Sequence, residues 1–326
     1  MSVATVLLSI QQNVYGIAGP ILIGIGSISC ILNLMVFSKS TLRKNPCTMC
    51  LIAVNLINFV YFYFGVLMAT LGTGYNIDPS TTNIYFCRIR FYMSSVLACC
   101  QSSYIVLASI DRTLITSPNA GTRQRSTRRL IIISMIGISL FWMIFESHAL
   151  IFTEILELGP DYFICYYQPG IYTVFMSYHA FIVNGILPTL LMIIFGCWTV
   201  KNIRTVNRVK PETNSIGIRN ITVIRPVIVR SKDQQLVRML SVNIIAFIIC
   251  KFPSTLVLIY QQITQYEEKS SDQQLIEQLI LQLTFFWYFI DNGIDCYTNI
   301  LVSKTFRTEL KRIFVDAYHT YIRHRN

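Results

Sequence analysis

Acidic and basic side chains interrupt several of the long apolar stretches in this 326-residue chain. An ionised group inside a lipid bilayer costs about 2.5–3.5 kcal/mol, so each such residue is expected to face a partner or water. We therefore treat four of them as candidate functional residues: Glu146, Lys251, Asp291 and Asp295. Glu146 fits two environments, a hydrogen bond between helices or contact with lipid headgroups.

No set of side chains points to catalysis or to metal binding. A catalytic site needs a nucleophile beside a base, or a group of metal ligands, whereas the histidines are scattered singly at His148, His179, His319 and His324. Cys47 and Cys50 form a CxxC, but a zinc site of that kind needs a second pair. We predict that the protein is no enzyme and has neither a metal site nor a cofactor.

Long apolar helices must carry these residues. The chain is 53% hydrophobic and only 13% charged, against about 25% charged residues in a soluble domain. Seven stretches are long enough to cross a membrane as helices. They are residues 14–37, 47–71, 86–115, 130–152, 172–200, 236–262 and 275–302. The predicted fold class is all-α, a polytopic seven-transmembrane helix bundle.

The placement of charge predicts the orientation in the plasma membrane. Lys and Arg gather after the first, third and fifth spans and in the C-terminal tail, while the other connections are mostly acidic. Positively charged loops stay in the cytoplasm, so residues 1–13 form a short extracellular tail and the C-terminus is cytoplasmic. The net charge of +11 then indicates that the basic residues contact membrane lipids and not nucleic acid.

Residues 303–326, after the bundle at 14–302, are predicted to hold a short amphipathic eighth helix and a short cytoplasmic tail. Within 303–315, apolar residues share one face and basic residues share the other, as expected of a helix lying on the inner leaflet. The apolar face comprises Phe306, Leu310, Ile313 and Phe314.

Two of the ten cysteines fall on the predicted extracellular side. Cys87 begins the third span and Cys165 lies in the loop before the fifth. Because that compartment is oxidising, we predict a disulfide between them.

Several residues, in order along the chain, resemble the rhodopsin-like (class A) G-protein-coupled receptors. Cys87 stands 25 residues before Arg112 of an Asp111-Arg112-Thr113 motif, the spacing found in that family. Further matches are Asn33, Trp142, Pro188, Phe247 and the Cys250-Lys251-Phe252-Pro253 pattern. The resemblance covers most of the chain and implies a divergent, orphan-type receptor that passes an extracellular signal to a heterotrimeric G protein.

The chain departs from the family pattern in the membrane interior. Asn55 stands where the family has an aspartate in the second span, and Asp295 stands where it has an asparagine in the seventh. Lys251 replaces a tryptophan, while Gly196 and Asn299 replace two tyrosines that help to hold the active state. These departures leave an alternative function open, a seven-span protein with lost or altered coupling that serves as a scaffold or decoy.

The resemblance also implies roles for residues at the cytoplasmic end. Arg112 would be held by Asp111 and Asp233 in a latch that opens when the sixth span swings outward; the alternative is that Asp233 is a solvated loop acid. The hinge residues would be Pro188, Phe247 and Pro253.

A second implied group is an intramembrane polar network. Family packing places Lys251 beside Asp291, with Asp295 or water as the alternative partner of the lysine. The full network is Asn33, Asn55, Gln101, Lys251, Asp291 and Asp295. Many relatives bind sodium in this region, but a single acid beside a lysine argues against sodium here.

The ligand class is narrowed by the absence of two residues that other members of the family use to bind their ligands. Ser94 replaces the aspartate that pairs with amines, and Phe289 replaces the lysine that binds retinal. Acidic outer loops and aromatic residues favour a basic or amidated peptide. The predicted ligand pocket contains Ser94, Tyr166, His179, Phe285 and Phe289, although His179 fits a packed or lipid-facing position equally well.

Overall fold

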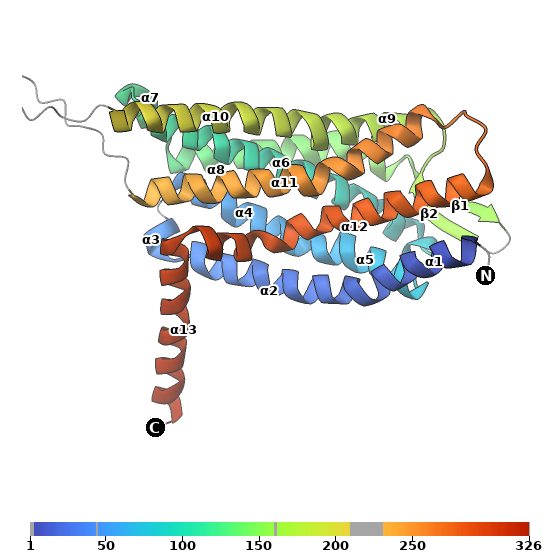
Figure 1. Ribbon diagram of the computed structural model, residues 1–326, viewed down its shortest axis with the longest axis horizontal. Coiled ribbons are helices and arrows are strands. Elements are labelled where there is room, and N and C mark those ends of the chain that lie inside the picture. Colours follow the sequence, from blue (N-terminus) through green and yellow to red (C-terminus); the bar gives the residue numbers. More distant parts are fainter. Residues whose placement is uncertain (1–2, 44, 160–161, 209–230, 326) are drawn as a thin grey trace, which may run out of the picture.

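The computed structural model describes residues 3–43, 45–159, 162–208 and 231–325. In that part of the chain, seven long helical segments lie along the long axis of the molecule (Figure 1). In chain order they consist of α1 (Val3–Asn13), η1 (Val14–Ala18) and α2 (Gly19–Phe37); α4 (Pro46–Tyr61), η2 (Phe62–Val66), α5 (Leu67–Ala69) and η3 (Thr70–Gly74); α6 (Ile84–Thr116); α8 (Arg128–Phe145) and η5 (Glu146–Leu150); α9 (Ile171–His179), η6 (Ala180–Ile186) and α10 (Leu187–Arg208); α11 (Ser231–Ile263); and α12 (Ser271–Val302).

The seven predicted spans fall on these seven segments, so the all-α prediction is confirmed. The first segment is already helical at Val3, well before residue 14, because no glycine or proline interrupts the chain between Val3 and Tyr15. Short helices α3 (Ser40–Arg43), η4 (Pro79–Thr81) and α7 (Ala120–Arg125) lie in the connections.

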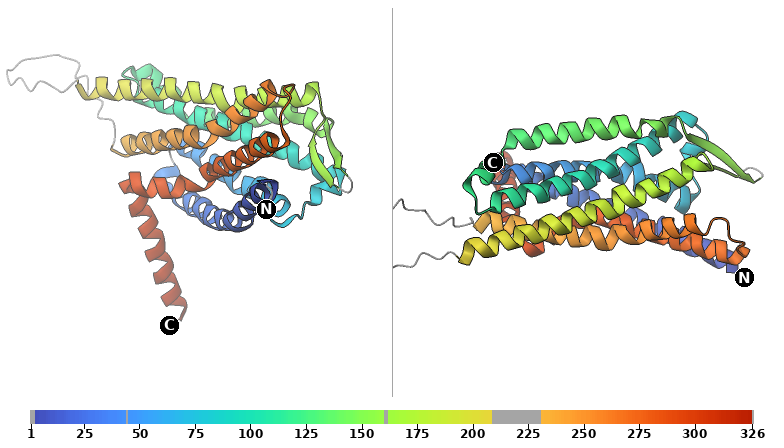
Figure 2. Two further views of the ribbon diagram at one scale, coloured as in Figure 1. Left: turned by 45° about the vertical axis from the view of Figure 1, so that its right-hand side comes forward. Right: turned by 90° about the horizontal axis from the view of Figure 1, so that it is seen from above.

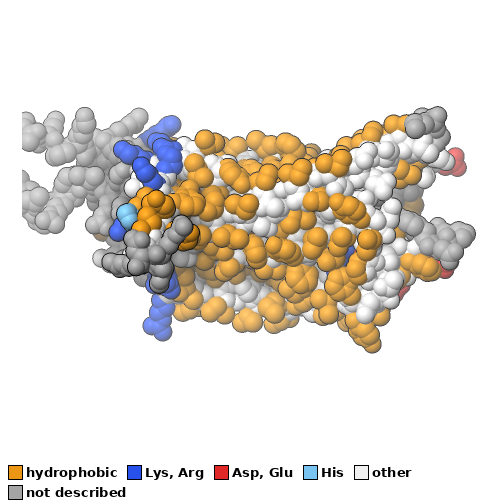
Figure 3. All heavy atoms as spheres, turned by 90° about the horizontal axis from the view of Figure 1, so that it is seen from below, with side chains coloured by type: hydrophobic (Ala, Val, Ile, Leu, Met, Phe, Trp, Pro, Cys, Tyr) orange, Lys and Arg blue, Asp and Glu red, His pale blue; other side chains and the backbone are white. Residues whose placement is uncertain are grey.

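Large apolar side chains cover the outer surface of the bundle (Figure 3). They include Ile21, Ile28, Ile136, Phe141 and Ile194, all more than half exposed. Lys and Arg gather at one end of the view and acidic side chains at the other. Six of the described helical segments are long and apolar enough to cross a membrane, and α12 is as long but more polar. The chain is a multi-pass membrane protein.

Polar side chains fix where several spans begin. The Asn45 side chain accepts a hydrogen bond from the backbone amide of Cys47 at the start of α4. Asn83 does the same at α6, where it accepts from two backbone amides, and Thr127 does so at α8. Because the first amides of a helix have no intrahelical partner, these caps set the helix starts.

Glycine allows three spans to approach closely. A Cβ atom at Gly26 of α2 would lie 2.2 Å from Phe62 Cζ, and one at Gly293 of α12 would lie 3.1 Å from Gly26 Cα. Phe62 is fully buried and fills the space that the two glycines leave. Close approach of this kind positions the polar side chains that α2, α4 and α12 carry further along.

A β-hairpin closes the end of the bundle that holds the N-terminus (Figure 2). Strands β1 (Thr153–Gly159) and β2 (Tyr162–Tyr167) pair antiparallel, with Ile155 opposite Cys165. Cys165 forms a disulfide with Cys87 at the start of α6, with Cα atoms 5.7 Å apart. The predicted disulfide is therefore confirmed, whereas the hairpin was expected only as a loop.

Helix α13 (Lys304–Arg325) leaves the opposite end of the bundle at a steep angle to the other helices (Figure 1). Phe306 and Ile313 pack into the bundle, and the Phe306 ring contacts Phe37 edge-on at 5.7 Å. Phe314, expected on the same apolar face, is 57% exposed. The helix continues to Arg325, beyond the predicted amphipathic stretch.

Candidate functional site

A lysine lies buried in the interior of the bundle. Lys251 of α11 is 1% exposed, and its Nζ lies 3.5 Å from Oδ2 of Asp291 on α12. The same nitrogen donates a hydrogen bond to Gln101 Oε1 on α6. It also lies 4.9 Å and 4.5 Å from the ring centroids of Phe247 and Tyr288. The carboxylate, the amide and the two ring faces together offset the cost of burying an ammonium group.

Amide side chains extend this cluster to the second and seventh spans. Gln101 Nε2 donates to Asn58 Oδ1 at 2.7 Å and to Asn292 Oδ1 at 2.9 Å. Asn58 Nδ2 in turn donates to Asp295 Oδ2 at 3.3 Å. Gln101 therefore connects α6 with α4, α11 and α12, and each of its bonds ends on a buried group.

A second amide cluster lies among α2, α4 and α12. Asn33 Nδ2 donates to Asn55 Oδ1 at 2.8 Å, and Asn299 Nδ2 donates to Asn33 Oδ1 at 3.3 Å. The three side chains are at most 2% exposed. Asn299, one of the departures from the family pattern, thus closes a contact between the first and seventh spans.

Two members of the network, Asn58 and Asn292, were missed by sequence reasoning. Helical spacing could have found both, because Asn58 lies about one turn after Asn55 and Asn292 about one turn before Asp295. The faces of α4 and α12 that carry the predicted residues therefore carry the missed ones as well.

Arg112 of α6 is buried at the end of the bundle opposite the N-terminus. Its Nη2 donates to Asp111 Oδ2 at 2.8 Å and also to Asn45 Oδ1 at the start of α4. Asp111 also accepts a hydrogen bond from Ser126 Oγ. Asn45 is a partner that sequence reasoning missed, because it caps a helix 67 residues away along the chain. The Asp233 side chain, the other predicted partner, lies outside the described residues.

The residue after this arginine joins the third span to the fifth. Thr113 Oγ1 donates to the Phe195 backbone oxygen at 3.0 Å and contacts Thr199 Oγ1 at the same distance. Asn202 Nδ2 donates to the Thr113 backbone oxygen at 3.1 Å. Gly196 leaves open space beside this contact, since nothing lies within 4 Å of the position of a Cβ atom there.

The predicted hinge residues lie where helical geometry is weakened. Pro253 is inside α11, and Pro188 follows the π-helical turn η6 at the start of α10. Proline removes one backbone hydrogen bond from each helix. Phe247, 1% exposed, lies on α11 about one turn before Lys251 and beneath its ammonium group.

These contacts place a polar network and a buried Asp-Arg pair inside one helix bundle, and a comparison with known families decides what the bundle is. Residues 29–292 match the model of the 7 transmembrane receptor (rhodopsin family). The chain belongs to this family. No curated protein matches the sequence. The family indicates a receptor and not an enzyme.

The residues predicted to line the receptor's ligand pocket come from four elements, α6, β2, α9 and α12. Tyr166 is 37% exposed on β2 and contacts Phe91 edge-on at 6.0 Å. Phe289 is buried against Tyr61. Ser94 and Phe285 are partly exposed. The roles of these residues stay predictions.

His179 is neither exposed to lipid nor free in the bundle interior. Its Nε2 lies 3.3 Å from Oε1 of Glu146, which is itself fully buried. Glu146 Oε1 also accepts a hydrogen bond from Cys99 Sγ on α6, at 3.5 Å. Of the two environments considered for Glu146, the interhelical one is correct.

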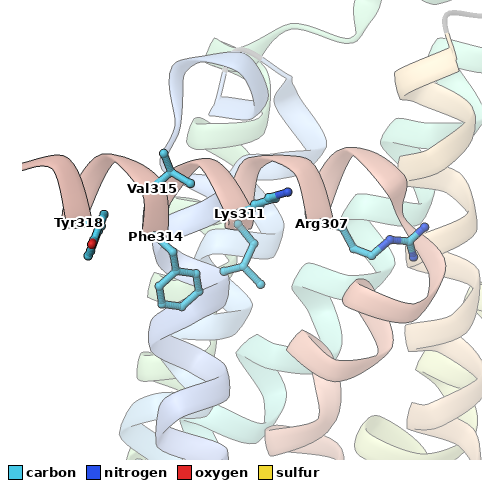
Figure 4. A pocket seen from close by; sticks show the side chains of 6 residues that line it. Arg307, Lys311, Phe314, Val315 and Tyr318 are labelled. Carbon is cyan, nitrogen blue, oxygen red and sulfur yellow. The ribbon is translucent and has the colours of Figure 1, made fainter.

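A pocket of about 450 Å³ lies at α13, far from the hairpin (Figure 4). Its lining comes from one helix, with Phe314 and Tyr318 beside the basic residues Arg307 and Lys311. Arg307 Nη1 also donates to the backbone oxygens of Ile300 and Leu301, which end α12. An apolar strip with flanking cations suits the boundary between acyl chains and anionic headgroups.

Proposed function

We propose that the receptor transmits the binding of an extracellular ligand to a heterotrimeric G protein, with its N-terminus outside the cell and its C-terminus in the cytoplasm. The observation that carries this proposal is the burial of Arg112, 1% exposed between Asp111 and Asn45. An arginine held in this way closes the inner end of the bundle. Release of the arginine as the sixth span moves outward would open a site for the G protein.

The distribution of charge supports this orientation. Basic residues in the connections and helix ends on the Arg112 side include Lys39, Arg123, Arg125, Arg128 and Lys201. Acidic residues in the connections at the hairpin end include Glu154, Glu157, Glu267 and Glu268. Because basic connections stay in the cytoplasm, the hairpin faces the outside of the plasma membrane.

The hairpin end also supports a basic or amidated peptide as the ligand. Phe163, Tyr166 and Tyr266 are exposed there, at 44%, 37% and 88%. Aromatic faces and carboxylates both attract cationic groups. A short peptide could contact both.

The polar network would couple the ligand site to Arg112. Gln101 and Arg112 lie on the same helix, α6, and Gln101 holds Lys251 on α11. A ligand that moves α11 must change the Lys251 contacts, and it shifts the equilibrium only by binding the two arrangements with different affinity. The ammonium group of Lys251, which is part of the chain, then provides the positive charge that a bound sodium ion provides in many relatives.

The test is a screen of cells that express the chain against a library of basic and amidated peptides, read by G-protein dissociation. A matched control is Arg112→Gln, which removes the charge but leaves the extracellular end unchanged. We expect a peptide that activates the wild type, still binds the variant and no longer signals through it. Binding without signalling in the wild type would contradict the proposal.

That last outcome would favour the second candidate function, a scaffold or decoy. Two observations favour it: the open space beside Gly196, and the Asn299 contact with Asn33 where the family has a tyrosine. Both replace groups that stabilise an active state. Restoring Gly196→Tyr and Asn299→Tyr in one chain would then be expected to raise signalling.

A further inference from the structure

Three residues from different spans bring a thiol, a carboxylate and an imidazole together. They are Cys99 of α6, Glu146 at the start of η5, and His179 at the end of α9. Their ligand atoms all lie within 4.8 Å of one another, and the three residues are buried. Residues 47 and 33 positions apart in sequence meet here. We propose that this cluster is a zinc-binding site, which we call the Cys99–Glu146–His179 site.

The distances suit a tetrahedral metal ion. Cys99 Sγ lies 3.5 Å from Glu146 Oε1, and His179 Nε2 lies 3.3 Å from the same oxygen. Bonds of about 2.0–2.3 Å to a tetrahedral ion separate its ligand atoms by roughly 3.3–3.7 Å. Two of the three pairs of ligand atoms are therefore already at tetrahedral spacing, and the third pair, Cys99 Sγ and His179 Nε2, lies within 4.8 Å.

The imidazole is held with its nitrogen toward the site. The His179 ring stacks against Phe145 at 5.6 Å and against Phe175 at 6.0 Å between centroids. Its Nε2 nevertheless forms no hydrogen bond within the described part of the chain, despite its closeness to Glu146. A ring fixed by packing with a buried, unsatisfied nitrogen is what a metal ligand requires.

An amide side chain lies beside the thiol. The Asn184 side chain, in the π-helical turn η6, lies within hydrogen-bonding reach of Cys99. Its Oδ1 is buried and has no hydrogen-bond partner among the described residues. A water can occupy the fourth position, as in zinc sites with three protein ligands.

The charges explain why the ion should be a dication that accepts sulfur and nitrogen. When the metal binds, the Cys99 thiol gives up its proton to solvent and becomes a thiolate. A thiolate and the Glu146 carboxylate then neutralise the two positive charges of Zn²⁺. The net charge of the site is zero, which is favourable inside a membrane. Thiolate and imidazole select zinc over calcium and magnesium.

The test uses Co²⁺ as a visible probe for Zn²⁺. The full chain is purified in nanodiscs under argon without thiol reductant, so that the Cys87–Cys165 disulfide stays closed. We expect one equivalent of Co²⁺ to produce a thiolate-to-cobalt charge-transfer band that Zn²⁺ abolishes. Cys99→Ser should lose the band, and Glu146→Gln or His179→Gln should weaken binding by at least about tenfold. The matched control is Cys100→Ser, whose cysteine is also buried on α6 and is outside the site.

No band in the wild type would overturn the proposal, as would a band that survives Cys99→Ser or disappears in Cys100→Ser. If the ligand variants do not fold, the wild type still decides. Alkylation of Cys99, followed by peptide mass spectrometry, should slow when Zn²⁺ is added, while alkylation of Cys100 should not. Equal rates for Cys99 with and without Zn²⁺ would also overturn the proposal.

Discussion

Lys251 and Asp291 meet 3.5 Å apart in the interior of the bundle, one from the sixth span and one from the seventh. Both are almost completely buried, so neither charge has bulk water beside it. The pair is also continuous with Gln101, and through it with α4 and α6. A change at Lys251 therefore alters contacts that involve four spans, those formed by α4, α6, α11 and α12.

The first prediction is that the two charges depend on each other. Lys251→Met alone leaves a buried carboxylate, and Asp291→Asn alone leaves a buried ammonium; each should destabilise the receptor by about 3–5 kcal/mol. The double variant removes both charges and should recover much of the loss. Surface expression and thermal unfolding of the purified proteins measure this. Additive effects would show that the two residues act independently.

The second prediction concerns the Arg112 contact with Asn45. Asn45→Ser keeps a side chain that can cap α4 but is too short to reach the guanidinium. Loss of a hydrogen bond to a charged group, about 1.5 kcal/mol, should raise ligand-independent G-protein activation about tenfold. Asn119→Ser is the control, since Asn119 caps α7 in the next loop on the same side. Unchanged basal activity at equal surface expression would contradict the proposed latch.

Asp233→Asn should act in the same direction if Asp233 belongs to that latch. Removing one partner of a buried charge pair destabilises only the state that contains the pair. The measurement is again basal activation at matched surface expression. A solvated loop acid would leave basal activity at the wild-type level.

The third prediction tests the close approach at Gly26. Gly26→Ala places a methyl group within 2.2 Å of the fully buried Phe62 ring and should destabilise the receptor by about 1–3 kcal/mol. Gly24 is the control, because no atom lies within 4 Å of the position of its Cβ. Gly24→Ala should leave the unfolding temperature unchanged or raise it. Equal effects at the two positions would refute the packing argument.

The fourth prediction concerns the disulfide. Cys87 and Cys165 are 78 residues apart, and opening a loop of that length costs roughly 4.5 kcal/mol of stability in the chain-entropy model. Cys87→Ser with Cys165→Ser should therefore lower the unfolding temperature and reduce surface expression. Cys197→Ser, which removes an exposed free cysteine, should do neither. Loss of stability in the Cys197 variant instead would point away from the disulfide.

The sequence was sufficient to predict the features that depend on local pattern. The apolar spans follow from composition and length, and the positions of Cys87 and Cys165 follow from the topology of those spans. Lys251 and Asp291 could be singled out because an ionised residue in an apolar stretch is conspicuous on its own.

Features that depend on which helix ends lie side by side in space could not be predicted from local pattern. Asn45 reaches Arg112 only because α4 begins beside the end of α6. Glu146 and His179 meet only because the fourth span ends beside the fifth, and no spacing in the sequence encodes that. The hairpin was missed because its pairing depends on the disulfide and on the surface it covers.

During synthesis, α12 must enter the bilayer with Asp291 and Asp295 in its apolar stretch, and each acid raises the free energy of insertion by about 2.5–3.5 kcal/mol. Helix α11 carries the matching lysine and is joined to α12 by residues 264–270 only. Entry of the two helices as one hairpin would bury Lys251 and Asp291 as partners and not as separate ions. We therefore expect the sixth and seventh spans to insert together, so that a nascent chain that stops before Ser271 would hold Lys251 unstably in the membrane.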